Sequence, residues 1–273
     1  MGVFKMSKFK MIGLDIDGTL LNSKHQITTE TNKAIKTAVN EKGIPVILVS
    51  ARMPKGIIFL QRELEIEAPI ICYSGALVLD KNGEILSQKY MSVSDIKEVY
   101  AAAKKLGVHV SLYKDDEWCI EKMDEWAKQE YEITSIIPNV INFEFLFEAW
   151  GKEGSGANKI LCMADPDKIN LLKDQLKIDS LNIYPSKPTY LEIMPKEASK
   201  TSAIEILRKK FNVKQREILA AGDNYNDMDM IEYAGLGVAM GNAPDEVKRC
   251  ADFVTLSNDE DGVAKVIKKF CLG

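Results

Sequence analysis

The stretch that decides the fold of this chain is MIGLDIDGTL, at positions 11–20. Apolar residues of strand character run directly into two carboxylates, Asp15 and Asp17, and then into Gly18, which allows the backbone to turn. On a strand, residues i and i+2 point to the same side, so we expect both carboxylates to face one pocket. Two like charges this close favour a bound cation, and Mg²⁺ is typically held by one or two carboxylates. The alternative is a solvated strand end that carries acidic residues.

The composition excludes several classes of function. The chain has 36 Lys and Arg against 40 Asp and Glu, a net charge of -4, and so lacks the basic field that nucleic-acid binding requires. No apolar run reaches the ~18 residues of a membrane span. The first ten residues have no apolar segment of the kind found in signal peptides. We therefore expect a cytoplasmic protein without membrane or nucleic-acid partners.

Few residues are available for histidine or cysteine chemistry. The five cysteines form no C-x-x-C pair and are odd in number, which favours reduced thiols. His25 and His109 are the only histidines, so histidine-based triads and H-E-x-x-H zinc sites are not expected. Acid–base chemistry would fall to carboxylates or lysine.

The first third of the chain alternates strands and helices. After the opening strand the pattern predicts a helix over 28–42 that ends at Gly43, a strand over 44–49, a helix from Pro54 and a strand over 69–73. This βαβαβ order is typical of a doubly wound parallel sheet with an α/β fold. Ligands of such sheets bind at the carboxyl ends of the strands, so Asp15, Ser50 and Ser74 should converge at one edge.

The pattern changes after Ser74. Asn82-Gly83 lies between two short apolar stretches, as in a β-hairpin. Further on we expect a helix ending at Leu106, strands over 108–113 and 118–120, a helix over 124–132, an aromatic-rich segment over 143–150, a loop over 151–156, a strand over 159–163, a helix from Asp165-Pro166, and strands over 181–184 and 190–194. We interpret residues 89–191 as an inserted α+β domain. Residues 1–88 and 192–273 would then form a discontinuous Rossmann-like core.

The strand–helix alternation resumes at Ser199, which is placed to cap a helix. A buried strand over 218–221 then runs into a second group of acids in GDNYND, residues 222–227. A strand over 236–240, a helix opened by Pro244 and a final helix over 262–271 complete the expected core.

Four residues at predicted strand ends or helix starts each have a ligand-binding and a structural interpretation. Ser50 can offer its hydroxyl and nearby backbone N–H groups to a phosphate, or can merely cap a helix. Lys200 at a helix start is unfavourable beside the positive end of the helix dipole unless an anion is near; alternatively it is a surface lysine. Asp223 and Asp227 could cap the helix that follows. Their common placement at one predicted edge favours a site for phosphate and metal.

Taken in order, these segments resemble the four motifs of the haloacid dehalogenase superfamily of phosphatases. The segments are DIDGTL (15–20), SAR (50–52), Lys200 and GDNYND (222–227). The insertion resembles the large α/β cap of the Cof-type branch of that superfamily. The resemblance spans nearly the whole chain.

The resemblance implies a hydrolase of small phosphorylated metabolites, with sugar phosphates as the first expectation and a monomer or weak homodimer as the assembly. Asp15 would be the nucleophile that forms an aspartyl-phosphate, and Asp17 the general acid and base. Mg²⁺ would be held by Asp15, the backbone carbonyl of Asp17 and Asp223, with Asp227 and Thr19 as bracing residues. The groups expected around the phosphoryl oxygens are Ile16, Ser50, Ala51, Lys200 and Asn226.

Three positions depart from the family pattern. Ala51 stands where glycine is more common, and a positive φ there would cost about 1 kcal/mol. Ser74 replaces a frequent asparagine and Thr201 a frequent glycine. Two other functions stay open, a phosphomannomutase-like phosphosugar mutase and a catalytically silent phosphometabolite-binding protein. A receiver-type signalling domain, also phosphorylated on aspartate, is about half this length and has no insertion.

Overall fold

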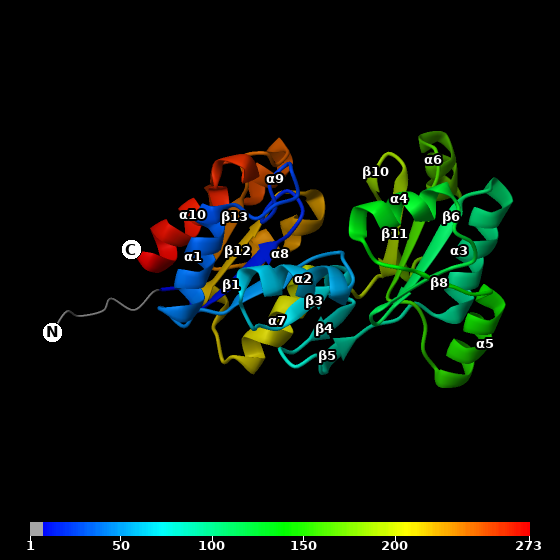
Figure 1. Ribbon diagram of the computed structural model, residues 1–273, viewed down its shortest axis with the longest axis horizontal. Coiled ribbons are helices and arrows are strands. Elements are labelled where there is room, and N and C mark those ends of the chain that lie inside the picture. Colours follow the sequence, from blue (N-terminus) through cyan, green and yellow to red (C-terminus); the bar gives the residue numbers. More distant parts are fainter. Residues whose placement is uncertain (1–7) are drawn as a thin grey trace. The chain divides into compact units, whose positions relative to one another are not determined.

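The computed structural model describes residues 8–273, and the contacts within it divide these residues into two compact units (Figure 1). The first unit comprises residues 8–52, 57–87 and 199–273. The second comprises Met53–Gly56 and Gln88–Ala198. The expected boundary at 191/192 falls inside strand β11 (Tyr190–Pro195), which pairs with two strands of the second unit. Contacts therefore assign residues 192–198 to the second unit.

The first unit is built on an eight-stranded sheet with the order β14-β13-β12-β1-β2-β3-β4-β5. Neighbours from β14 to β3 pair in parallel, and β4 is antiparallel to β3. This is the doubly wound α/β sheet that the sequence predicts. Its strands are β1 (Met11–Asp15), β2 (Val46–Val49), β3 (Ile70–Cys72), β4 (Leu77–Leu79), β5 (Ile85–Gln88), β12 (Ile218–Gly222), β13 (Leu236–Ala239) and β14 (Phe253–Val254).

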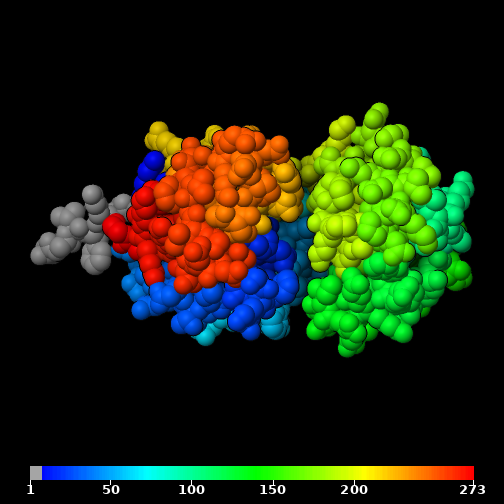
Figure 2. Space-filling view, turned by 90° about the horizontal axis from the view of Figure 1, so that it is seen from above, coloured from blue at the N-terminus to red at the C-terminus, as the bar shows by residue number. Residues whose placement is uncertain are grey.

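Helices cover both faces of this sheet. They are α1 (Thr29–Asn40), α2 (Pro54–Leu64), α7 (Lys200–Lys210), α8 (Met228–Tyr233), α9 (Asp245–Cys250) and α10 (Gly262–Ile267). α1 and α10 pack against each other, so the blue and red ends of the described chain lie side by side in Figures 1 and 2. α7 and α8 pack on the opposite face, where Ile204 and Met230 share an apolar cluster with Met11 of β1.

The alternation along β1 directs its last residue toward α7. A Cβ on Gly13 would lie 3.5 Å from Cδ1 of Ile204, so Met11 and Gly13 face α7. Asp15 follows on the same side of the strand. Ser199 begins α7 as expected, because its hydroxyl accepts the N–H of Ser202 at 3.0 Å.

The second unit is an α+β fold with a six-stranded sheet of order β10-β11-β9-β6-β7-β8. Pairing is antiparallel except between β7 and β8. α3, α5 and α6 contribute to one apolar core with β6, β9 and β11 (Figure 1). The elements are α3 (Val93–Leu106), β6 (His109–Lys114), β7 (Glu117–Ile120), α4 (Glu125–Thr134), β8 (Asn139–Val140), α5 (Phe143–Glu153), β9 (Lys159–Met163), α6 (Pro166–Gln175), β10 (Leu181–Lys187) and β11.

Some local predictions differ from the structure. The expected loop over 151–156 is wrong at its start, because α5 continues to Glu153 and ends at Gly154, whose φ is 66°. Lys152 extends the helix by pairing with Glu148 one turn earlier, at 2.6 Å. The two-residue strands β8 and β14 were not predicted. The five cysteines form no disulfide, and none of the helices among residues 8–273 is long and apolar enough to cross a membrane.

Candidate functional site

The carboxyl ends of three neighbouring strands gather the side chains that the sequence singles out. β12, β1 and β2 are adjacent and parallel, and Asp223, Asp15 and Ser50 lie at their ends. Ser74 joins them, because its backbone N–H donates to the carbonyl of Ser50 at 2.9 Å. The sheet edge therefore places together residues from four distant parts of the sequence, as a doubly wound sheet is expected to do.

Lys200 is at the centre of a buried charge cluster. Its Nζ donates to Oδ1 of Asp15 at 2.6 Å and to Oδ1 of Asp227 at 2.5 Å. The Lys200 side chain is only 1% exposed, and that of Asp227 is fully buried. The alternative of a surface lysine is therefore wrong. Lys200 is the first residue of α7 and Asp15 is the last residue of β1, so their contact brings the start of α7 to the end of β1.

The cluster contains more negative than positive charge. Asp15, Asp223 and Asp227 have carboxylate oxygens within 4.8 Å of one another, and Lys200 bonds to two of these residues, Asp15 and Asp227. Burial, followed by repulsion from Asp227, raises the pKa of Asp15 well above its usual value, with Lys200 acting in the opposite direction. Burial also disfavours the ammonium, but Asp15 and Asp227 outweigh it and raise the pKa of Lys200.

Asp227 has both carboxylate oxygens engaged by the protein. Oδ1 accepts from Lys200, and Oδ2 accepts the backbone N–H groups of Asp223 and Asn224, each at 3.0 Å. A Cβ on Gly222 would lie 2.5 Å from the Cβ of Asp227, so this approach requires glycine. Asp227 therefore braces the loop after β12, which leaves Asp15 and Asp223 better placed to contact a ligand.

Asp223 is oriented by two neighbouring segments. The hydroxyl of Thr19 donates to its Oδ1 at 2.9 Å, and the amide of Asn242 lies 3.4 Å from its Oδ2. The same amide donates to the carbonyl of Gly18 at 2.9 Å. Gly18 has a φ of 86°, and a Cβ there would lie 2.3 Å from Oδ2 of Asp223. Burial, then Asp227, raises the pKa of Asp223 to about 6.

Asp17 lies next to the buried cluster rather than within it. Its side chain is 51% exposed, and its carboxylate is not among those that gather within 4.8 Å in the described chain. The alternation of side chains does not extend to it, because β1 ends at Asp15 and the backbone then turns at Gly18. The guanidinium of Arg52 instead holds the Asp17 carboxylate, with Nε–Oδ2 at 2.9 Å and Nη2–Oδ1 at 2.6 Å.

Ser50 and its neighbours form the other side of this edge. Ser50 is buried, and its hydroxyl accepts the N–H of Arg52 at 3.1 Å, so it is not a cap of α2. Ala51 is not among the described residues with positive φ, and the expected strain there is absent. Asn226 is half-buried in the turn after β12, and Ile16 is fully buried.

Strain occurs instead after β3. Tyr73, Ser74 and Gly75 have consecutive φ values of 50°, 51° and 100°. Tyrosine and serine adopt this left-handed region at a cost, whereas asparagine tolerates it better. The Ser74 hydroxyl is buried and has no hydrogen-bond partner in the structure. This loop is therefore a strained part of the same sheet edge.

Sequence reasoning assigned no role to Arg52 and Asn242. Arg52 lies in the SAR segment that carries the resemblance, and Asn242 lies in the loop after β13, so a polar residue shortly after a strand end is the available signal for both. Their contacts join loops that are distant in the sequence, so local patterns could not reveal them.

Comparison with known proteins decides the family. Residues 12–267 match the sequence model of the haloacid dehalogenase-like hydrolases. The chain belongs to this family. A putative phosphatase of Haemophilus influenzae is 34% identical over 267 residues, which cover 96% of this chain and 98% of that protein. A 5-amino-6-(5-phospho-D-ribitylamino)uracil phosphatase of Bacillus subtilis is 30% identical and covers 96% of each chain.

Solved structures of the family have the same architecture. A haloacid dehalogenase-like hydrolase from Bacteroides thetaiotaomicron is 31% identical, with a TM-score of 0.85 over 96% of this chain and 99% of that one. A sugar phosphatase of subclass IIB is 25% identical, with a TM-score of 0.81 over 96% and 98% of the two chains. This haloacid dehalogenase-like protein is thus a phosphatase-type hydrolase with a Rossmann-like core and an inserted cap.

Phosphatases of the haloacid dehalogenase family generally use a divalent metal, and the residues present fit one. Asp15 and Asp223 provide hard oxygen donors. Burial, and after it the excess negative charge, raises the pKa values of both aspartates, and a divalent cation would offset that charge. The structure thus provides a donor set suited to such an ion.

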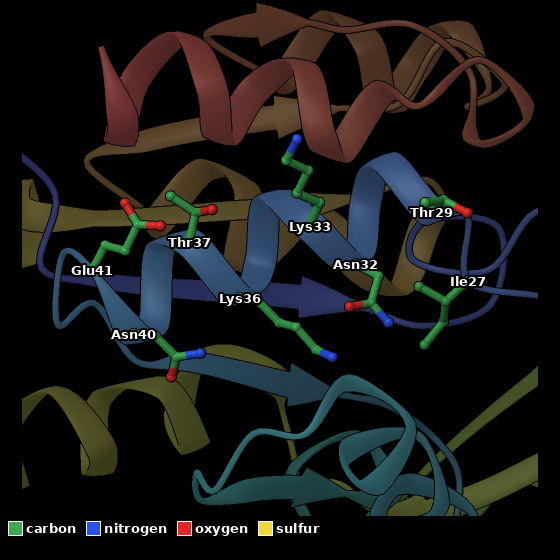
Figure 3. A pocket seen from close by; sticks show the side chains of 8 residues that line it. All are labelled: Ile27, Thr29, Asn32, Lys33, Lys36, Thr37, Asn40 and Glu41. Atoms are coloured by element: carbon green, nitrogen blue, oxygen red, sulfur yellow. The ribbon is translucent and has the colours of Figure 1, made fainter.

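A separate groove of about 510 Å³ runs along α1 and contains none of these residues (Figure 3). It is lined by Ile27, Thr29, Asn32, Lys33, Lys36, Thr37, Asn40 and Glu41. Lys36 is already paired with Glu65 at 3.0 Å. None of the side chains that gather at the strand ends lines this groove.

Proposed function

We propose that this protein is a Mg²⁺-dependent phosphatase that hydrolyses small phosphorylated metabolites, sugar phosphates above all, through an aspartyl-phosphate on Asp15. The observation that carries the proposal is the buried Lys200 between Asp15 and Asp227, with Asp223 alongside. The names of the relatives, among them a sugar phosphatase and a phosphatase of a phosphorylated ribityl compound, support this substrate class.

Each side chain has a defined part in the proposed reaction. A carboxylate oxygen of Asp15 attacks phosphorus, the bond from phosphorus to the leaving oxygen breaks, and that oxygen takes a proton from Asp17. Water then attacks the aspartyl-phosphate and gives a proton to Asp17, which releases inorganic phosphate and restores Asp15. The net reaction converts a phosphate monoester and water into an alcohol and phosphate.

The remaining groups stabilise charge. Lys200 keeps one oxygen of Asp15 fixed, and we propose that its ammonium also faces the phosphoryl group together with Ser50, Asn226 and the backbone N–H groups of Ile16 and Ala51. Mg²⁺ would be held by Asp15, Asp223 and the carbonyl of Asp17. When bound, it neutralises charge that develops on the phosphoryl oxygens.

We also propose that the inserted residues 89–191 choose the substrate. The strand-end residues would contact phosphate, metal and the scissile oxygen, which every phosphate monoester has in common. Exchanging residues 88–198, the inserted part of the second unit, for the corresponding part of a relative with another substrate preference should therefore change the substrate ranking. The requirement for Asp15 should remain, and a folded chimera with the original ranking would contradict the assignment.

A phosphate-release screen over phosphorylated metabolites, with Mg²⁺ or with a chelator, tests the proposed function. We expect turnover of sugar phosphates that the chelator abolishes and that Lys200→Met removes. Lys33→Met, which changes an exposed lysine in the groove of Figure 3, is the matched control and should keep full activity. Absence of phosphate release from every ester would contradict a phosphatase. Transfer of phosphate back to sugar would indicate the mutase instead.

A further inference from the structure

Asp17, the proposed general acid, lies outside the buried cluster and is bound by Arg52. Its Nε and Nη2 donate to different oxygens of Asp17, at 2.9 and 2.6 Å. Such forked pairing fixes the plane of a carboxylate as well as its position, which a lysine cannot do. Asp17 is therefore held in one orientation although half of its side chain is exposed.

The backbone of Arg52 is itself anchored. Its N–H donates to the hydroxyl of Ser50 at 3.1 Å, and its carbonyl accepts the N–H of Tyr73 at 3.2 Å. Tyr73 begins the strained turn after β3. The backbone of Arg52 is thus held by residues that follow β2 and β3. The guanidinium that binds Asp17 is therefore anchored at its base.

The pair is poorly suited to a purely stabilising role. The side chains of Arg52 and Asp17 are 32% and 51% exposed, and ion pairs at that exposure contribute little to folding. Removal of the guanidinium should therefore leave the fold intact. Any effect on catalysis can then be measured on a folded protein.

We propose that Arg52 is the positioning residue of Asp17. The inference rests on the proposed function, in which Asp17 protonates the leaving oxygen. Both Asp17 oxygens are bonded to Arg52, so the oxygen that carries the proton must give up one of these bonds, while the other keeps the carboxyl group oriented. The O–H bond of Asp17 breaks as the O–H bond of the product alcohol forms, and the electron pair of the P–O bond goes to that oxygen.

A series of leaving groups tests this role. p-Nitrophenol leaves as a weakly basic anion without a proton, whereas a sugar alkoxide needs one. Arg52→Ala should lower kcat/KM, which reports the steps up to formation of the aspartyl-phosphate, by about ten- to a hundredfold for sugar phosphates, the scale of a misplaced catalytic group. For p-nitrophenyl phosphate we expect a loss in kcat/KM of no more than about threefold, because its leaving group needs no proton and the later step, in which Asp17 takes a proton from water, does not enter kcat/KM. Arg52→Lys should recover only part of the loss, because lysine lacks the forked geometry.

A double-mutant cycle with Asp17→Asn separates positioning from direct phosphate binding. If Arg52 acts through Asp17, adding Arg52→Ala to Asp17→Asn should cost less than about twofold in kcat. Arg216→Ala is the matched control, because Arg216 is exposed and precedes β12 at the other end of that strand. This variant should retain wild-type rates.

The outcomes distinguish the two proposals. A loss from Arg52→Ala that is equal for both esters, or that adds fully to Asp17→Asn, overturns the positioning role while the phosphatase function stands. A wild-type protein that hydrolyses neither ester overturns the proposed function and this inference with it. An Asp17→Asn loss in kcat/KM that does not depend on the leaving group refutes the acid role and, again, the inference.

Discussion

Both units of this protein bury charged side chains, but with different balances. In the second unit Lys159 of β9 lies 2.9 Å from Glu192 of β11, as an ion pair rather than an aligned hydrogen bond, and both side chains are 10% exposed. This contact pairs an ammonium with a carboxylate. At the strand ends of the first unit Lys200 meets Asp15 and Asp227, with Asp223 close by. A balanced buried pair can be purely structural, whereas the excess negative charge of an unbalanced cluster is what the proposed divalent cation would offset.

The second unit also contains a buried hydrogen-bond network around His109. His109 contacts Asp124 at 2.9 Å and Ser111 at 3.0 Å, an order of residue types familiar from serine hydrolases. Ser111 is completely buried, however, and its hydroxyl also accepts the indole N–H of Trp118 at 2.9 Å. Asp124 caps α4 by accepting the N–H of Ala127. Because the hydroxyl is inaccessible, we interpret the network as structural, which agrees with the expectation that no histidine-based triad operates here.

The largest effect is expected from Asp15→Asn. The change keeps the shape of the side chain but removes the attacking charge, so kcat should fall about 10⁴-fold or more. Steady-state kinetics on the best sugar phosphate would measure this, with circular dichroism to confirm folding. Retention of more than about a tenth of the wild-type rate would exclude the covalent mechanism.

Breaking the balanced pair should affect stability instead. Lys159→Met leaves the Glu192 carboxylate buried without its cation, which typically costs about 3–5 kcal/mol of unfolding free energy. Urea denaturation would show the loss, while calorimetry should find unchanged affinity for Mg²⁺. Adding Glu192→Leu should restore most of the stability. A double variant as unstable as Lys159→Met would show that the pair has a further partner.

A smaller change in the unbalanced cluster is expected from Asn242→Ala. The amide of Asn242 links the carbonyl of Gly18 to Asp223, so its loss should weaken Mg²⁺ binding by about tenfold, as removal of groups that orient metal ligands does. Isothermal titration calorimetry measures this without turnover. Asn40→Ala, in the groove along α1, is the control that should bind Mg²⁺ normally. Equal affinity in the two variants would refute a role for Asn242.

The smallest effect concerns acid stability of the second unit. Burial lowers the pKa of His109 below its usual 6.5, although Asp124 acts in the opposite direction. The unfolded chain therefore binds this proton at a higher pH than the folded protein, and stability should fall as the pH drops below 6.5. His109→Gln should reduce that fall in urea titrations at decreasing pH. The exposed His25, whose φ is 57°, provides the control His25→Asn, which should behave as wild type.

The sequence predicted the sheet and the cluster for identifiable reasons. Buried parallel strands are continuous apolar runs, and acids directly after such runs lie at one edge, so the grouping of Asp15 with Asp223 could be anticipated. The orientation of Asp17 could not, because alternation is a property of the strand and β1 ends at Asp15. The contact of Arg52 with Asp17 depends on how two loops approach each other, which no periodicity records.

Backbone strain at this sheet edge could not be located from the sequence. Ala51, where a positive φ would have been costly, does not have one, whereas Tyr73 and Ser74 do. Their conformation follows from hydrogen bonds to residues near Ser50 across the sheet edge, namely Tyr73 N–H to Arg52 and Ser74 N–H to Ser50. Long-range contacts of this kind override local preference.

The absence of a Cβ at Gly18 and Gly222 limits which substitutions these two positions can accept. A methyl group at either position would overlap atoms of Asp223 or Asp227 at 2.3 to 2.5 Å. A library that randomised these two codons would yield mostly folded proteins with a displaced acid, and therefore few active clones. A genomic copy that retains the four aspartates but has alanine or serine at either glycine is thus expected to be a decaying gene, which a search for acidic residues alone would count as intact.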